Sequence, residues 1–335
     1  MNVLFDSPML HALILGVVLA SALLGATAYF IWVERKFAGR MQSRVGPAHV
    51  GWKGLLQPIA DAFKLLIKED IVPRSADKVL FNLAPLLAVF VALLALAVLP
   101  LAPGLVIADL DVGVLFVLAA GAMTVVPTWM AGWGSNNKYA LLGGMRAIAQ
   151  SVAYGVPLVL GALVPVILSG SMNLSEIVAA QAGGHWFAFW PPGPGLAGGL
   201  IFVLATLAEG NRIPFDIPEA ESELVSGIST EYTGMKFGMF YLGEYVHSLI
   251  GAALFVTLFL GGYDGPGPDV LGLQLFWFLF KTALVSMLLL WVRWTYVRVR
   301  SDQLMTLCWK YLLPGGLAVV VVAALCAWWG IGGRT

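Results

Sequence analysis

Long uncharged apolar runs recur along the whole chain and alternate with short polar connections. A bilayer is crossed by about 17 to 25 predominantly apolar residues in an α-helix. The runs predict about eight spans, at approximately 9–33, 79–101, 112–133, 147–168, 194–208, 237–262, 270–292 and 311–329. We therefore expect an all-α integral membrane protein with a single polytopic membrane domain over residues 1–335.

The fifth run is short, and we expect residues 209–212 to lengthen its helix until Pro214 stops it. Keeping this span preserves an alternation of charge. Lysine and arginine occur in the first, third, fifth and seventh connections and are absent from the second, fourth and sixth. The positive-inside rule then places the odd connections in the cytoplasm and both termini outside. Because no lysine or arginine precedes Arg35, the first run is interpreted as a span and not as a cleaved signal peptide.

The first connection contains a candidate amphipathic helix at residues 55–68. Its apolar residues recur at helical spacing, and its polar residues gather on the opposite face, namely Gln57, Asp61, Lys64 and Lys68. Such a helix lies in the membrane interface on the cytoplasmic side. Packing on neighbouring helices as ordinary cover explains the pattern equally well.

Composition agrees with a membrane protein and limits the chemistry. Of the residues, 59% are hydrophobic and 11% are charged, against roughly 25% charged in soluble domains. The two cysteines and four histidines show no metal-binding spacing, and an iron–sulfur cluster needs about four thiolates. We expect no cofactor or metal on this chain, and the zero net charge gives no reason to expect nucleic acid.

The fifth connection and its flanks are rich in acidic residues, with Arg212 and Lys236 as the basic ones. The acids are Glu209, Asp216, Glu219, Glu221, Glu223 and Glu231. If Pro218 opens a helix, Glu219 and Glu223 share one face of it. Crowded carboxylates repel when ionised, which favours proton uptake near neutral pH. A solvated acidic loop or a docking site for a basic partner fits the charge pattern as well.

Glu244 is predicted to lie two turns inside the sixth span, where a charge costs roughly 2.5 to 3.5 kcal/mol or more. An intramembrane carboxylate is a functional candidate by default. His247 is one turn further on and is a candidate to share a proton with it, and Lys281 in the seventh span is a candidate cationic partner. The alternative is a buried structural ion pair without transport.

Glu34 and Arg35 end the first span, and Arg44 follows. Topology anchoring explains most of the basic charge there. The same residues are also suited to line the mouth of a cavity that binds the polar headgroup of a lipid-soluble ligand. These alternatives stay open on the residues alone.

Six stretches carry a resemblance to a known family. They are VERKFAGRMQSRVGP (33–47), GLLQPIADAFKLLIKEDIVP (54–73), SNNKYALLG (135–143), AEGNRIPFDIPEAESELVSG (208–227), TEYTGMKFGMFYLGEY (230–245) and SDQLMTLCWKYLLP (301–314). In this order they resemble the H subunit of bacterial respiratory complex I, NADH:quinone oxidoreductase, the counterpart of mitochondrial subunit 1. The match covers nearly the whole chain.

The resemblance implies a quinone-binding, proton-coupling membrane subunit in the bacterial inner membrane, catalytic only within its complex. Expected partners are peripheral quinone-module subunits, small or antiporter-like membrane subunits, quinone and lipid. FMN and iron–sulfur clusters belong to partner subunits. By motif, Glu34, Arg35, Arg44 and Asp61 correspond to the quinone entrance and cavity. The residues that correspond to the acidic proton path are Glu209, Arg212, Asp216, Glu219, Glu221, Glu223, Glu231 and Glu244.

The chain departs from the family pattern at four positions, which are Gly155, Gly210, His49 and Ser229. Gly155 stands where the family usually has a membrane glutamate, and glycine cannot carry a proton. We predict that a water chain or a carboxylate of a neighbouring subunit substitutes there. Two alternatives to a respiratory subunit remain: the equivalent subunit of a membrane-bound hydrogenase or related dehydrogenase, and an independent ion transporter. The identity of neighbouring genes would distinguish the hydrogenase-type subunit from the respiratory subunit. Activity of the lone chain would support the independent transporter.

Overall fold

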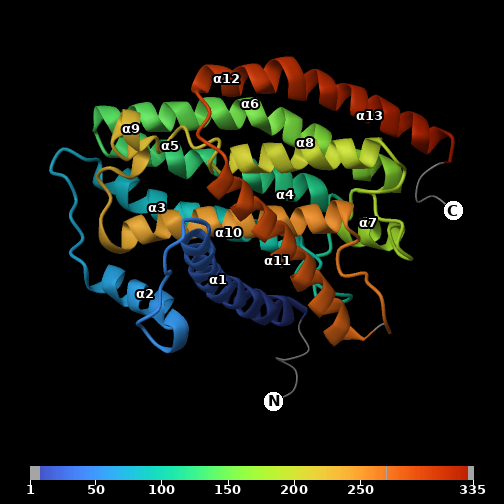
Figure 1. The fold of residues 1–335 in the computed structure, drawn as a ribbon, viewed down its shortest axis with the longest axis horizontal. Helices are drawn as coiled ribbons and strands as arrows, with labels where there is room; N and C mark the ends of the chain where they lie inside the picture. The colour runs from blue at the N-terminus through green and yellow to red at the C-terminus, as the bar shows by residue number, and fades with distance from the viewer. Residues whose placement is uncertain (1–7, 269, 331–335) are drawn as a thin grey trace.

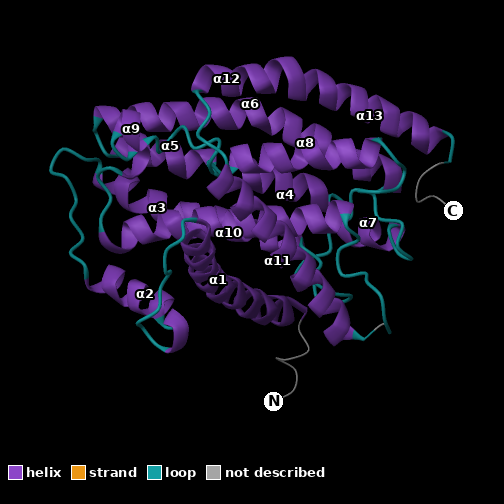
Figure 2. Ribbon diagram, viewed as in Figure 1, coloured by secondary structure: helices purple, strands orange, loops and turns teal. Residues whose placement is uncertain are grey.

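The protein is described by a computed structural model at residues 8–268 and 270–330, and this part of the chain is built of helices and loops without a β-strand (Figure 2). Seven helical segments are long and apolar enough to cross a membrane, and α8, Pro194–Glu209, is a shorter apolar helix. The prediction of an all-α membrane protein with about eight apolar helices is confirmed.

Each predicted run corresponds to a helix or to a pair of consecutive helices. In chain order these are α1 (Pro8–Met41), α3 (Lys78–Leu94), α4 (Gly113–Ala122) with α5 (Val125–Gly134), α6 (Lys138–Ser169), α8, α10 (Gly234–Phe259), α11 (Leu271–Thr295), and α12 (Ser301–Thr306) with α13 (Leu313–Trp328). The short helices between them are α2 (Gln57–Ile67), α7 (Leu174–Ala180) and α9 (Glu221–Leu224). A π-helical stretch, Leu307–Leu312, joins α12 to α13.

Helix ends differ from the hydropathy boundaries where polar residues continue a helix. The helix α1 extends beyond Val33 to Met41, and α6 begins at Lys138 and not near 147. Asn137 starts α6, because its side chain accepts a hydrogen bond from the Tyr139 amide. The expected extension of the fifth run is wrong: α8 ends at Glu209, and residues 210–212 form a turn.

Consecutive long helices run in alternating directions through the bundle. In Figure 1 the connections that enter α2 and α6, the segment around α9 and the start of α12 lie in the left half of the molecule, whereas α7 lies at the right end. Helices α6 and α8 pack side by side under α13, and α10 packs against α3 and α11. The connections predicted to share the cytoplasmic side therefore lie in the same half of the molecule.

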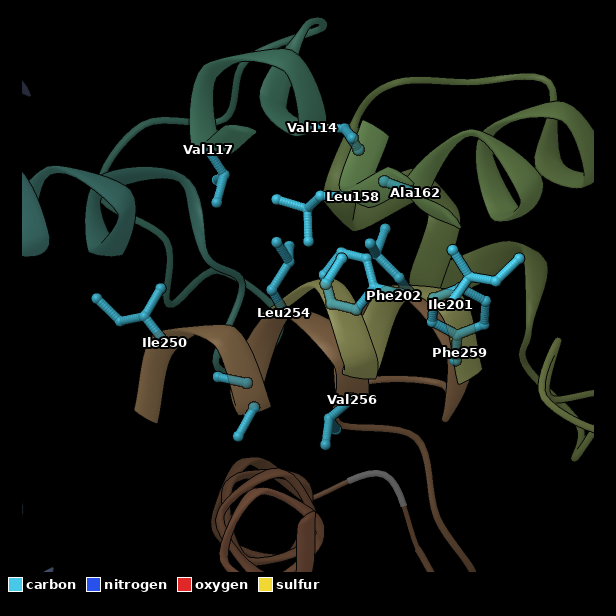
Figure 3. Packing of buried hydrophobic residues seen from close by; sticks show 14 of the residues in the cluster. Val114, Val117, Leu158, Ala162, Ile201, Phe202, Ile250, Leu254, Val256 and Phe259 are labelled. Carbon is cyan, nitrogen blue, oxygen red and sulfur yellow. The ribbon is translucent and has the colours of Figure 1, made fainter. Parts of the chain in front are cut away.

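The largest apolar core lies where α4, α6, α8 and α10 meet. Figure 3 shows Leu158, Phe202 and Leu254 directed into this core, with Val117 and Phe259 beside them. Phe202 and Phe259 are among the largest fully buried side chains. The close packing of α8 into this core shows why a helix shorter than its neighbours is still part of the bundle.

The predicted amphipathic helix is confirmed as α2, which covers most of the expected range 55–68. None of its residues is buried, and Phe63 and Ile67 expose apolar surface. The helix α2 contacts α1 and α10. The helix therefore lies against the side of the bundle and not within it.

Candidate functional site

A cavity of about 530 Å³ lies between α1, α2, α10 and the end of α11. Its wall contains all four residues predicted from the sequence for a quinone entrance, which are Glu34, Arg35, Arg44 and Asp61. The segments that contribute them are far apart in sequence from α10 and α11, which complete the cavity with Tyr241, Tyr245 and Arg293. The structure thus brings the predicted residues to one place.

Arg35 and Asp61 hold α1 and α2 together across this cavity. Arg35 Nη1 donates to Asp61 Oδ2 at 2.5 Å, and Gln57 Nε2 donates to Asp61 Oδ1 at 2.9 Å. Arg44 makes a local hydrogen bond, in which its Nε donates to Gln42 Oε1 at 2.6 Å. The pair of Arg35 and Asp61 is solvent-accessible, with half of the Arg35 side chain exposed.

Glu34 forms a buried ion pair that the sequence did not reveal. Its Oε1 lies 2.9 Å from Nη1 of Arg293, at the end of α11, and its Oε2 has no hydrogen-bond partner among the described residues. Arg293 also donates to the Tyr245 hydroxyl at 3.5 Å. From the sequence, Arg293 was counted with the basic residues of the seventh connection. An arginine at the end of a span gives the same sequence pattern whether it anchors the helix or lines a cavity.

Glu244 pairs with Arg212 and not with Lys281 as the sequence interpretation expected. Arg212 Nε lies 3.2 Å from Glu244 Oε1, and the guanidinium carbon lies 4.2 Å from the centre of the Tyr245 ring. The turn after α8 brings Arg212 to α10 beside Glu244, whereas Lys281, on α11, lies at the C-terminal end of α10.

Lys281 instead binds the end of α10. Its ammonium donates to the backbone carbonyl oxygens of Leu260, at 2.7 Å, Gly262, at 3.2 Å, and Asp264. It also lies 4.4 Å from the centre of the Trp186 ring. A cation at the carboxyl end of a helix satisfies its unpaired carbonyls and its negative dipole end. The geometry therefore gives Lys281 a structural role at this end of the bundle.

His247 approaches Glu209, a partner that the sequence did not suggest, and it shares a cavity with its candidate partner Glu244. Its Nε2 lies 3.9 Å from Glu209 Oε2. A cavity of about 80 Å³ is lined by Glu209, Glu219, Glu244 and His247, so three carboxyl groups and the histidine border one space. A second cavity of about 30 Å³ continues past Glu209 and His247 toward α4.

The remaining acids of the fifth connection are matched by partners from other connections. Asp216 accepts from Arg298 at 2.8 Å, Glu223 accepts from Arg146 at 2.5 Å, and Glu231 accepts from Asn137 at 2.6 Å. The suggestion that Pro218 opens a helix is wrong, because α9 begins only at Glu221. The side chain of Glu221 lies outside the described part of the structure.

Gly155 lies on α6 beside a well-packed contact with the last helix. Tyr154 donates to the Leu304 carbonyl at 2.9 Å, and Cys308, in the π-helical stretch, approaches the Ala153 carbonyl at 2.9 Å. No described atom outside the local helix backbone lies within 4 Å of the position that a Cβ on Gly155 would take. This position has open space where the resemblance implies a glutamate.

Comparison with known proteins decides the family. The sequence model described as NADH dehydrogenase matches residues 14–324. The chain belongs to the NADH dehydrogenase family. It is 49% identical over 315 residues to the H subunit of NADH-quinone oxidoreductase from Dehalococcoides mccartyi (strain CBDB1), covering 94% of this chain and 86% of that protein.

Other relatives of the NADH dehydrogenase family match over similar lengths. NADH-quinone oxidoreductase subunit 8 of Rhodothermus marinus is 44% identical over 334 residues, covering 96% of this chain and 98% of that protein. The H subunit of the same enzyme from Bacillus thuringiensis subsp. konkukian (strain 97-27) is 48% identical over 317 residues, covering 93% and 92%. The predicted resemblance to the complex I H subunit is confirmed, and the chain is a multi-pass membrane subunit of this enzyme class.

Proposed function

We propose that this chain is the membrane subunit of a proton-translocating NADH:quinone oxidoreductase that admits quinone to the 530 Å³ cavity and couples its reduction to proton movement. The observation that carries the proposal is the convergence of Glu34, Arg35, Arg44 and Asp61 on that cavity. The names of the relatives support NADH as the electron source over a hydrogenase-type module.

The cavity has the chemistry that a quinone requires. Its volume falls within the range of about 300 to 1,000 Å³ that is typical of small-molecule sites. Ala28, Ile31 and Leu242 supply apolar wall for a quinone ring and tail. The arginines supply hydrogen-bond donors for the carbonyl oxygens of the headgroup.

A series of ionisable pairs leads from this cavity into the bundle. Glu34 with Arg293 lies at the cavity, Glu244 with Arg212 follows, and Glu209 with His247 lies next. Small cavities separate the later members and have room for water. Carboxylates in this arrangement are suited to pass protons when the charge in the cavity changes during quinone reduction.

The complex supplies what the chain lacks. FMN and iron–sulfur clusters are expected in peripheral subunits docked on the basic, cytoplasmic connections, and the acidic series is expected to continue into antiporter-like membrane subunits. We place the chain in the bacterial inner membrane because its relatives are subunits of a bacterial NADH-quinone oxidoreductase. We place both termini outside because the basic connections lie in the same half of the bundle. The whole chain acts as one membrane domain.

Proton translocation driven by NADH and a short-chain quinone, in vesicles containing the whole complex, tests the proposal. We expect Glu244→Gln to assemble, to retain quinone binding and to abolish proton movement, because an amide cannot exchange the proton. Native translocation by the Glu244 variant would overturn the proton route through this subunit. In Gly155→Glu, which has open space for the side chain, an increase in protons per NADH would show that the native chain is under-coupled.

A further inference from the structure

Tyr245 lies between the two charged pairs nearest to the cavity. It is buried in α10 and lines the 530 Å³ cavity. Its hydroxyl accepts a hydrogen bond from Arg293, the partner of Glu34. The face of its ring contacts the Arg212 guanidinium, the partner of Glu244. One side chain therefore contacts the cation of each pair.

Arg212 depends on this ring because its hydrogen bonding is incomplete. The side chain is 4% exposed, and its Nε and Nη2 have no hydrogen-bond partner among the described residues. The 3.2 Å approach of Nε to Glu244 is close enough for an ion pair but lacks hydrogen-bond geometry. Bidentate hydrogen bonds would fix a guanidinium by themselves. Here the aromatic face, 4.2 Å from the guanidinium carbon, supplies the close contact that orients it.

We infer that Tyr245 is a positioning residue for coupling, whose ring holds Arg212 against Glu244 while its hydroxyl holds Arg293 at the quinone cavity. This rests on the proposed function. The two contacts link the charge in the cavity to the position of the cation that neutralises Glu244. When Arg293 is drawn toward a negatively charged quinone species, the hydroxyl contact changes and the ring that supports Arg212 is no longer fixed.

The two contacts predict different losses. Tyr245→Leu removes the ring, and we expect the protons moved per NADH to fall by roughly half or more, because the guanidinium loses its cation–π contact. Tyr245→Phe keeps the ring and removes the hydroxyl. We expect it to restore most of this ratio while raising the KM for quinone by roughly twofold to fivefold, because Arg293 loses a contact at the cavity. Packing alone would not separate the two measurements in this way.

Arg212→Lys gives an independent measurement, since lysine keeps the charge and loses the planar guanidinium. We expect Arg212→Lys to lower the ratio as Tyr245→Leu does, and the double variant to be no worse than either one, because both break the same contact. Tyr29→Phe is the matched control for loss of a hydroxyl, since Tyr29 is exposed on α1 and is not part of the cavity wall. If Tyr245→Leu does not assemble, Tyr245→Met serves for the same comparison.

Glu244→Gln in the same vesicles separates this inference from the proposed function. A native ratio in Tyr245→Leu together with lost translocation in Glu244→Gln would overturn the role of Tyr245 and leave the proton route standing. Native ratios in both variants would overturn the proton route and the inference with it. A low ratio in Tyr245→Leu that Tyr245→Phe restores supports both.

Discussion

Arg212 and Lys281 are two buried cations in one helix bundle, and they are held in opposite ways. Lys281 donates to three backbone carbonyls at the end of α10 and contacts the Trp186 ring. Arg212 leaves two of its nitrogens without a hydrogen bond among the described residues and faces a carboxylate and an aromatic ring. A buried donor without a partner is costly. The contrast indicates that Lys281 stabilises the end of α10, whereas Arg212 is positioned by an ion pair and an aromatic ring.

Replacing Lys281 by methionine gives the largest expected effect on stability. The change leaves three carbonyls without their donor, and we expect a loss of roughly 3 kcal/mol of stabilisation. The measurement is the temperature at which the purified complex loses half of its quinone reductase activity. Lys310→Met, at an exposed lysine of the π-helical stretch, is the control. In the surviving complex the protons per NADH should equal the native value, and a lower ratio would mean that Lys281 belongs to the transport machinery.

Gly121→Ala tests the series of ionisable pairs to which Arg212 belongs. It moves the Glu209 carboxylate without changing any charge. A Cβ on Gly121 would lie 2.9 Å from Oε1 of Glu209, so the carboxylate must shift. We expect the protons per NADH to fall by roughly a quarter to a half, since proton transfer depends on sub-ångström placement. Thermal stability should change little, because only the end of a side chain moves.

Gly25→Ala is the matched control for Gly121→Ala, since a Cβ on Gly25 meets no described atom within 4 Å. Equal ratios in the two alanine variants would show that the position of Glu209 does not matter for transport.

Arg35→Gln is expected to have the smallest effect on stability. The Arg35–Asp61 pair is solvent-accessible, and such pairs contribute about 0.2 to 1 kcal/mol. Because Arg35 lines the cavity, its loss should appear mainly as a higher KM for quinone, measured with a short-chain quinone. Lys53→Gln, in the same connection and outside the cavity wall, controls for the lost positive charge. A large drop in stability with an unchanged KM would contradict the assignment of Arg35 to the quinone site.

Hydropathy was sufficient to predict the helices but not their ends. Apolar runs report only the part of a helix within the hydrocarbon layer, so the polar continuation of α1 to Met41 and the early start of α6 at Lys138 were missed. The break between α4 and α5 was missed as well, because residues 123–124 do not interrupt the apolar run. Local hydrogen bonding and capping decide these positions.

The candidate site was predictable as a set of residues but not as a set of contacts. Charge pattern and motif identified Glu244, Glu209 and Arg212. Their partners depend on helices that meet only in the folded bundle, which is why Lys281 was assigned to the wrong group and Arg293 and Tyr245 were overlooked. An aromatic residue in an apolar helix carries no sequence signal that separates a lipid contact from a cation–π contact.

The helix α2 forms one wall of the cavity and is not itself buried in the bundle. It buries none of its residues, and its contacts with the neighbouring helices include the accessible Arg35–Asp61 pair and Leu65, which lies beside Gly238. Its amphipathic pattern predicts that the exposed apolar face rests in the boundary between headgroups and acyl chains. Under the proposed entry of quinone at this cavity, we expect lateral pressure and acyl-chain length to change the width of the opening.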